Sequence, residues 1–281
     1  MHPFFRRLLL TFLAAGLASA AGLAAFLVAT QEEGVFLSGN IETDSPILWG
    51  PGFDQQMATY KLRRVHYVRP DLLVLGSSRV TQIRGALAPD IRFYNAGLGA
   101  SSLPEALAFL KAVYRQRPPK VVVLGIDPWW FNPSQGAAPA YTPASFNYRR
   151  WLAGTVTRGM LSPTVMRRAL SGIDVEADRL GGRRPVGYLA AAKASGFRPD
   201  GSYQYGDVFL GLNPMLDVLA MTFDKDFAFY TAAARQADDR FRYVGGIAQR
   251  QIEILHAILK ANRAAGVETV LFLPSFPAAV W

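Results

Sequence analysis

The sequence predicts an α/β fold in which a parallel sheet follows a long apolar segment. Four short aliphatic runs alternate with helical segments, and residues 72–75 and 121–124 show two of these runs clearly. Each run is continuously apolar, which is typical of strands that are buried on both faces. Strands that alternate with helices favour a parallel sheet with helices on both of its faces.

The N-terminus is predicted to lie in a membrane. Arg6 and Arg7 precede residues 8–29, which carry no charge and are numerous enough to cross a bilayer as a helix. Positive charge before the segment and acidic residues after it orient the N-terminus toward the cytoplasm. A cleaved signal peptide is the alternative, because Ala18-Ser19-Ala20 fits a cleavage site. Both interpretations place the main domain in the periplasm or extracellular space, whereas a cytosolic protein with a buried N-terminal helix is the third possibility.

The predicted strands end in residues that suit a functional site. Three of them end at Gly76-Ser77-Ser78, at residues 95–100 and at Gly125-Ile126-Asp127, and the fourth covers residues 267–274. Ligands of open α/β sheets bind outside the carboxyl ends of the strands. We therefore expect the two serines and the aspartate at one edge, although the serines could simply cap the next helix.

Helix signals lie between these strands. Ser102-Leu103-Pro104-Glu105 fits a capping box ahead of a helix at residues 106–114, whose positive N-terminal end points toward the 95–100 loop. A second helix at residues 247–265 has an apolar stripe and is followed by Gly266, a typical residue just past a helix end.

In these motifs the chain resembles the SGNH (GDSL-like) hydrolase superfamily, and in particular a cell-surface branch that contains DltD-like and AlgJ-like proteins of polysaccharide acyl modification. Gly76-Ser77-Ser78 is similar to the first sequence block, with serine in place of aspartate, and residues 95–100 are similar to the second. Pro128-Trp129-Trp130-Phe131 resembles the branch pattern after the third block. The resemblance covers residues 68–135 and 245–276.

The resemblance implies a flavodoxin-like parallel sheet of SGNH type and a serine nucleophile at Ser78, with Ser77 as the alternative. It also implies an oxyanion hole from the backbone N–H groups of Ser78 and of Gly99 or Ala100. Asp127 stands where the family has a donating asparagine, and an ionised carboxylate accepts hydrogen bonds but cannot donate them.

Arg79 and Asn95 are expected near this site, in which neither a metal nor a cofactor is predicted. The superfamily takes its catalytic base from a late Asp-x-x-His block, which does not occur here. Of the three histidines, His2 precedes the apolar segment, His66 is expected on a solvated basic face, and His256 on a helix that covers the sheet. We therefore expect the complete protein to continue past residue 281 with a further strand and that block.

The predicted organisation has three parts: an anchor or signal peptide at residues 1–30, a linker and lead-in at 31–66, and an SGNH-like domain at 67–281. The domain carries an insertion at about 132–244, with helices expected at residues 146–157, 163–170 and 185–194 and with breaks at Gly181-Gly182 and Pro199-Asp200-Gly201. The aromatic residues of the insertion are expected to pack internally, or to form a lid that stacks on sugar rings.

Composition narrows the choice of partners. The formal net charge is +9, and the basic residues are scattered in pairs. For an exported domain, this charge predicts that the partners are anionic glycans or lipid headgroups and not nucleic acid. The chain has no cysteine, which excludes disulfides.

The expected function is serine-dependent acyl-ester chemistry, as an O-acyltransferase or esterase, on a cell-envelope polysaccharide or related polymer. The expected partners are the cytoplasmic membrane and a membrane-bound acyl donor. The alternative is a non-catalytic glycan-binding or scaffold subunit of a polysaccharide-modifying membrane complex. A phosphate site on the Gly-Ser-Ser turn is a weaker option, because the turn lacks the lysine and the long glycine loop of a P-loop.

Overall fold

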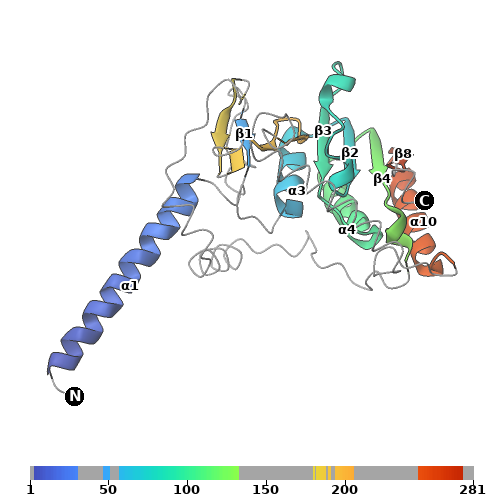
Figure 1. Ribbon diagram of the computed structural model, residues 1–281. Helices are drawn as coiled ribbons and strands as arrows, with labels where there is room; N and C mark the ends of the chain where they lie inside the picture. Colours follow the sequence, from blue (N-terminus) through green and yellow to red (C-terminus); the bar gives the residue numbers. More distant parts are fainter. Residues whose placement is uncertain are drawn as a thin grey trace, which may run out of the picture.

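The computed structural model describes residues 3–30, 47–50, 57–132, 180, 182–187, 189–190, 194–205 and 246–274. Its main sheet contains four parallel strands in the order β3-β2-β4-β8 (Figure 1). The strands are β2 (Leu72–Gly76), β3 (Phe93–Gly97), β4 (Val121–Gly125) and β8 (Glu268–Phe272). The prediction of an α/β fold with a parallel sheet is therefore confirmed.

The strand order creates a topological switch point. The chain passes from β2 outward to β3 and then returns across β2 to β4. In sheets with this order, ligands bind outside the carboxyl ends of the two strands where the direction reverses. These two strands are β2 and β4, whose ends carry the serine pair and Asp127.

Among the described residues, three helices cover one face of this sheet. They are α3 (Met57–Val68), α4 (Leu103–Tyr114) and α10 (Gln249–Ala264), and one apolar cluster joins them to alternate residues of β2, β3 and β4. Alternate strand residues point to one face, so all three helices lie on the same side. Two of the helices expected in the insertion, at residues 146–157 and 163–170, fall outside the described residues.

The predicted capping box and the predicted stop glycine lie at the ends of α4 and α10, although α10 covers Gln249–Ala264 and not residues 247–265. The Ser102 hydroxyl accepts a hydrogen bond from the Glu105 N–H at 3.4 Å and caps α4. The Glu105 carboxylate accepts from the Ser101 N–H at 2.7 Å, one residue earlier than in a standard capping box. Gly266 follows α10 with φ +70°, the left-handed conformation that glycine adopts without strain.

The run at residues 91–94 predicts a strand that begins at Ile91, but β3 begins two residues later, at Phe93, and Ile91 is 48% exposed before the sheet. At the other edge, β8 pairs only with β4 among the described residues. Its side chains Val270, Leu271 and Phe272 are 45%, 47% and 38% exposed. The described part of the sheet thus ends in an apolar, open strand.

A second, smaller sheet was not predicted. It contains β1 (Ile47–Trp49), β5 (Arg184–Val186), β6 (Gly196–Phe197) and β7 (Tyr203–Gln204), in the order β5-β1-β6-β7. The helix expected at residues 185–194 is wrong at its start, since Arg184–Val186 pairs with β1 as a parallel strand. This partner lies far away in the sequence, so local patterns could not reveal it.

The basic lead-in before the sheet is not a solvated face. Lys61 and Arg64 of α3 are 0% and 5% exposed. The Lys61 ammonium donates to the carbonyl oxygens of Asn95 at 3.0 Å and of Gly201 at 2.6 Å, and it lies 3.9 Å from the centre of the Phe197 ring. These contacts explain why a lysine is tolerated in the interior, and they make α3 part of the domain core.

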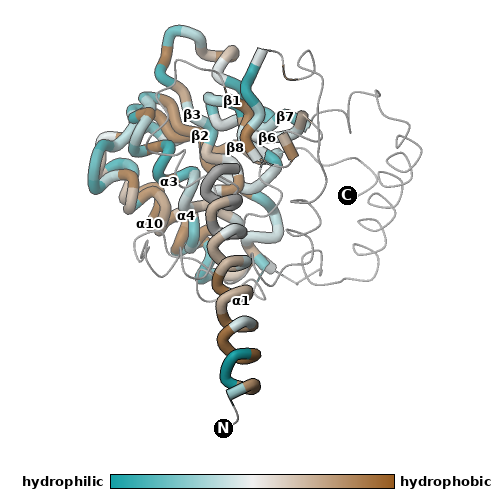
Figure 2. The backbone as a smooth tube through the Cα atoms, turned by 90° about the vertical axis from the view of Figure 1, so that its left-hand side faces the viewer, coloured by the Kyte–Doolittle hydropathy of each residue, from teal (hydrophilic) through white to brown (hydrophobic). Residues whose placement is uncertain are grey.

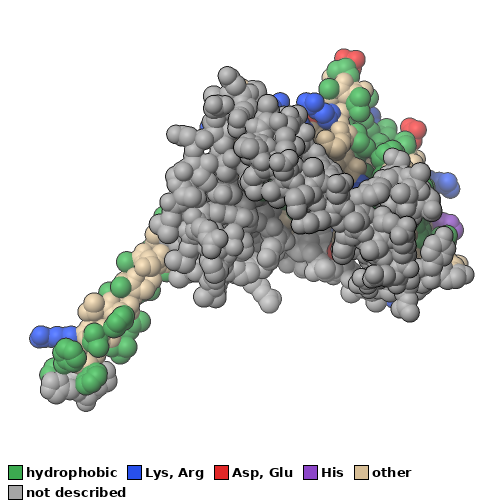
Figure 3. Space-filling view, viewed as in Figure 1, with side chains coloured by type: hydrophobic (Ala, Val, Ile, Leu, Met, Phe, Trp, Pro, Cys, Tyr) green, Lys and Arg blue, Asp and Glu red, His purple; other side chains and the backbone are tan. Residues whose placement is uncertain are grey.

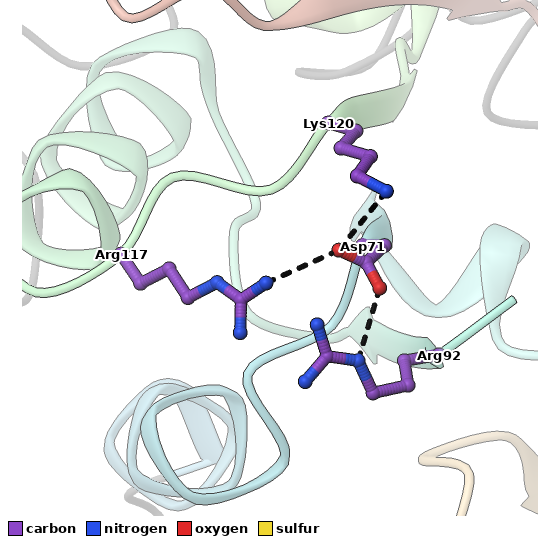
Figure 4. Close-up of polar contacts among 4 residues, drawn as sticks. All are labelled: Asp71, Arg92, Arg117 and Lys120. Atoms are coloured by element: carbon purple, nitrogen blue, oxygen red, sulfur yellow. Dashed lines mark hydrogen bonds and ion pairs between the residues drawn. The ribbon is translucent and has the colours of Figure 1, made fainter.

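At the amino edge of the sheet, one carboxylate contacts three basic side chains. Asp71, just before β2, lies 2.9 Å from Arg92, 3.3 Å from Arg117 and 3.9 Å from Lys120 (Figure 4). The hydrogen bond from Arg92 and the neighbouring positive charges lower the pKa of Asp71. This cluster lies at the edge opposite the switch point and belongs to the scaffold.

The apolar N-terminal segment forms one helix, α1 (Pro3–Thr30). Its part Pro3–Gly22 has a mean hydropathy of 1.4, and among the described residues it is the one helix long and apolar enough to span a membrane. Apolar residues run along it in Figure 2, and Figure 3 shows its exposed hydrophobic side chains, with basic ones near the free end.

Candidate active site

The serine loop starts directly at the end of β2. Ser77 caps a short 3-10 helix, η1 (Ser78–Val80), and its hydroxyl accepts from the Arg79 N–H at 3.3 Å. The Ser78 side chain is exposed, and no described residue hydrogen-bonds to its hydroxyl. The two serines therefore differ: Ser77 has a structural partner, and Ser78 presents a hydroxyl at the switch point.

Glycine at the strand ends lets this loop fold back over the sheet. A Cβ atom at Gly125 would lie 2.2 Å from Cγ1 of Val80, and one at Gly76 would lie 3.2 Å from the same side chain. Val80 is fully buried. The loop position therefore depends on two strand ends that have no side chains.

The loop after β3 lies beside the serine loop. The parallel register places Gly97 next to Gly76, and the Leu98 N–H donates to the Ser77 carbonyl oxygen at 3.3 Å. The Gly99 N–H donates to Ala96 at 2.9 Å, whereas no described residue accepts from the Ala100 or Ser78 N–H. Of the two loop amides predicted for the oxyanion, the geometry favours Ala100.

Asn95 connects the two loops through its side chain. Its amide nitrogen donates to the carbonyl oxygens of Val80 at 2.7 Å and Ile83 at 2.8 Å, and its amide oxygen accepts from the Gly97 N–H at 2.7 Å. The residue is fully buried. The sequence predicts Asn95 near the site, and the structure shows that its side chain joins the segment after β2 to the end of β3.

Asp127 and Arg79 form an ion pair at the same edge. Asp127, 1% exposed, lies between β4 and the short helix η3 (Pro128–Phe131), and its Oδ1 is 3.7 Å from the Arg79 guanidinium. The guanidinium also donates to the Pro274 carbonyl oxygen at 3.2 Å and lies 5.6 Å from the Trp129 ring centre. The sequence placed both charges near the site, but it gave no signal that they pair.

The hairpin of β6 and β7 holds the segment after the serine loop. The Tyr203 N–H donates to Thr81 at 2.9 Å, and the Asn95 N–H donates to Asp200 at 2.7 Å. Gly201 has φ +80°, in agreement with the predicted break. A Cβ atom at Gly201 would lie 2.1 Å from the backbone carbonyl oxygen of Asn95, so the hairpin packs directly on β3.

No histidine of the described residues lies at the carboxyl edge. His66 is half-buried between α3 and α4, with Nε2 3.4 Å from the Ala112 carbonyl oxygen, and burial lowers its pKa. The expected solvated face is therefore wrong for His66. His256 is exposed on α10, and His2 lies outside the described residues. Within the described ranges, no three His, Asp or Glu side chains form a metal-binding group.

Comparison with protein-family models, with curated proteins and with solved structures finds no match to this chain.

Proposed function

We propose that this chain carries out serine-dependent acyl-ester chemistry, as an SGNH-type O-acyltransferase or esterase that acts on a cell-envelope polysaccharide or related polymer. The observation that carries the proposal is the exposed Ser78 hydroxyl at the switch point between β2 and β4. The N–H groups of Ser78 and Ala100, which have no acceptor among the described residues, support it as oxyanion donors.

The reaction uses these groups in sequence. Ser78 Oγ attacks the acyl carbonyl carbon while a base takes its proton, and the carbonyl electrons move to the oxygen that the two N–H groups bind. The carbon–oxygen bond to the leaving alcohol then breaks, and the alcohol takes the proton back. Water or a polymer hydroxyl then attacks the acyl carbon and gives its proton to the base. The bond between this carbon and Ser78 Oγ breaks, and Oγ takes the proton from the base. The resemblance implies a histidine base oriented by an aspartate, and among the described residues no histidine lies at the carboxyl edge.

We also propose that α1 anchors the protein in the cytoplasmic membrane, with the domain on the outer side. The length and hydropathy of α1 and the basic residues Arg6 and Arg7 at its start support this orientation. A membrane-bound partner would then deliver the acyl group at the same surface.

A non-catalytic glycan-binding or scaffold role is the second candidate. It is favoured by Asp127, which stands paired with Arg79 where the resemblance expects a neutral donor, and by the absence of histidine from the described carboxyl edge. Both features would suit a site that holds a polymer without adding or removing acyl groups.

A fluorophosphonate probe applied to the full chain separates the two candidates. We expect labelling of the wild-type protein, loss of labelling in Ser78→Ala, and retained labelling in the matched control Ser77→Ala. Circular dichroism of each variant checks that it is folded. A folded wild-type protein that takes no label would favour the binding role, and retardation by an acidic polysaccharide in a gel would then measure that role directly.

A further inference from the structure

We propose that Arg79 is a catalytic residue whose guanidinium donates a hydrogen bond to the developing oxyanion, and that Asp127 and the Pro274 carbonyl oxygen hold it in place. This inference rests on the proposed function and names the side-chain donor of that same site.

The strand order places donors on both sides of the nucleophile. The loop after β3, with the Ala100 N–H, lies on one side of the β2 end, and the β4 and β8 ends lie on the other. Arg79 follows Ser78 directly and extends toward that second side, where it contacts Asp127 after β4 and the carbonyl oxygen of Pro274 after β8. A carbonyl group over Ser78 would therefore have a backbone donor on one flank and the guanidinium on the other.

The chemistry of the pair assigns the roles. Asp127 can only accept hydrogen bonds in its ionised form, so it cannot contact an oxyanion favourably. Arginine has five N–H donors in a planar fork and keeps its charge at all ordinary pH values. Of these two side chains, only that of Arg79 can stabilise negative charge.

The guanidinium is held before any substrate arrives. Asp127 is 1% exposed, and a carboxylate at such a depth requires a nearby cation. The Arg79 side chain is 20% exposed, and its contacts with Asp127 and Pro274 restrict the guanidinium. Donors fixed in this way need little reorganisation when charge develops, which is the condition for strong transition-state stabilisation.

In the proposed step, a bond forms between Ser78 Oγ and the acyl carbon, the serine proton passes to the base, and the carbonyl π electrons become a lone pair on the oxygen. Arg79 donates to this oxygen without losing its proton. When the tetrahedral centre collapses, the lone pair re-forms the carbonyl bond, the leaving alcohol departs with the proton from the base, and the bond to Arg79 weakens again.

The test measures the labelling rate with a fluorophosphonate and the kcat and KM for p-nitrophenyl acetate hydrolysis, on the full chain. We expect Arg79→Ala to lower kcat and the labelling rate by about 10²–10³-fold, with a smaller change in KM. Added guanidinium ion should restore part of the rate in Arg79→Ala and none in Ser78→Ala. Arg79→Lys should retain part of the rate, because it keeps the charge but loses the planar fork.

Two controls exclude a purely structural effect. Arg84→Ala removes an exposed arginine five residues later and should leave the rates unchanged. The double variant Arg79→Ala/Asp127→Asn also removes the buried negative charge that lies 3.7 Å from the Arg79 guanidinium, so it should regain thermal stability but not rate.

The outcomes separate the two proposals. A wild-type rate in Arg79→Ala would overturn the role of Arg79 and leave the proposed function intact. A loss that guanidinium does not restore, and that the double variant repairs together with stability, would show a structural role and overturn the inference. A folded wild-type protein without labelling or hydrolysis would overturn the proposed function and the role of Arg79 together.

Discussion

The N–H of Leu98 donates a hydrogen bond to the carbonyl oxygen of Ser77 across 3.3 Å. This contact joins the loop after β3 to the loop after β2, and Leu98 adopts φ +68° at that point. A non-glycine residue in the left-handed region costs free energy that the surrounding contacts must offset. The two loops therefore form one unit, in which a change in either loop moves the other.

Asn95→Ala should lower the stability of the domain and slow the reaction of Ser78 with a probe. The variant leaves the carbonyl oxygens of Val80 and Ile83 and the Gly97 N–H without their side-chain partner, at a cost of about 2–4 kcal/mol in the free energy of unfolding. Chemical denaturation measures the loss, and fluorophosphonate labelling should slow in the folded fraction. Gln82→Ala is the matched control, because among the described residues this exposed amide makes one hydrogen bond, to the Tyr203 carbonyl oxygen, and its loss should cost less than about 0.5 kcal/mol. Equal effects of the two variants would contradict the role of Asn95.

Gly125→Ala should destabilise the domain through one side chain. The added Cβ would overlap Val80, which cannot move without displacing η1, so we expect a loss of about 1–3 kcal/mol. Val80→Ala alone should also destabilise, because it empties buried space. The double variant should be less destabilised than the sum of the two, and a double-mutant cycle measures the coupling. Strict additivity would show that the overlap is relieved elsewhere.

The contribution of Lys61 to the free energy of unfolding should change as the pH rises toward 10.5. Burial lowers the pKa of Lys61 well below 10.5, so between that lowered value and 10.5 the unfolded chain binds more protons than the folded one. The free energy of unfolding therefore rises with pH across this window, and the cost of burying the charge is fully present below it. The difference in unfolding free energy between wild type and Lys61→Met should move in favour of wild type as the pH increases to about 10.5. A difference that stays constant with pH would contradict a lowered pKa.

The Asp71 cluster should stabilise the protein only above acidic pH. Neighbouring arginines lower the pKa of Asp71 below 3.8, so the stabilisation is present above the pKa of the unfolded chain and is lost as pH falls through the folded value. Asp71→Asn should therefore lower the melting temperature at pH 7 and have little effect in strong acid. High salt should reduce the difference as well, since the partners are exposed. Asp90→Asn changes an exposed aspartate without an ion pair among the described residues. This variant should alter neither the melting temperature at pH 7 nor its dependence on salt.

A charge in the middle of α1 should release the protein from membranes. Leu13→Arg places a guanidinium near the centre of the apolar part of the helix, at a cost of about 2.5–3.5 kcal/mol for insertion. We expect the wild-type chain and Leu13→Ala to remain in the membrane pellet after carbonate extraction, and Leu13→Arg to appear in the supernatant. The intact mass of the pelleted protein would show whether cleavage after Ala20 occurs.

Sequence patterns were sufficient to predict the main sheet, because its strands are continuous apolar runs such as residues 121–124, which end at a glycine. The rule that parallel strands share a carboxyl edge then placed Ser78 and Asp127 together. The small sheet was missed because its strands of two or three residues are too short to show a period. The burial of Lys61 and the pairing of Arg79 with Asp127 depend on residues that only the folded chain brings close.

The contact between Lys61 and Gly201 joins residues 140 positions apart, so it also bears on the order in which the molecule forms. Contacts with large sequence separation require the closure of long loops and are slow to appear. The neighbouring strands β2, β3 and β4 can pair across much shorter segments. We therefore expect a folding intermediate in which this part of the sheet is present while Lys61 is still hydrated and Asn95 lacks its contact with the hairpin. The serine loop would gain its final shape only in the last, slow phase of folding.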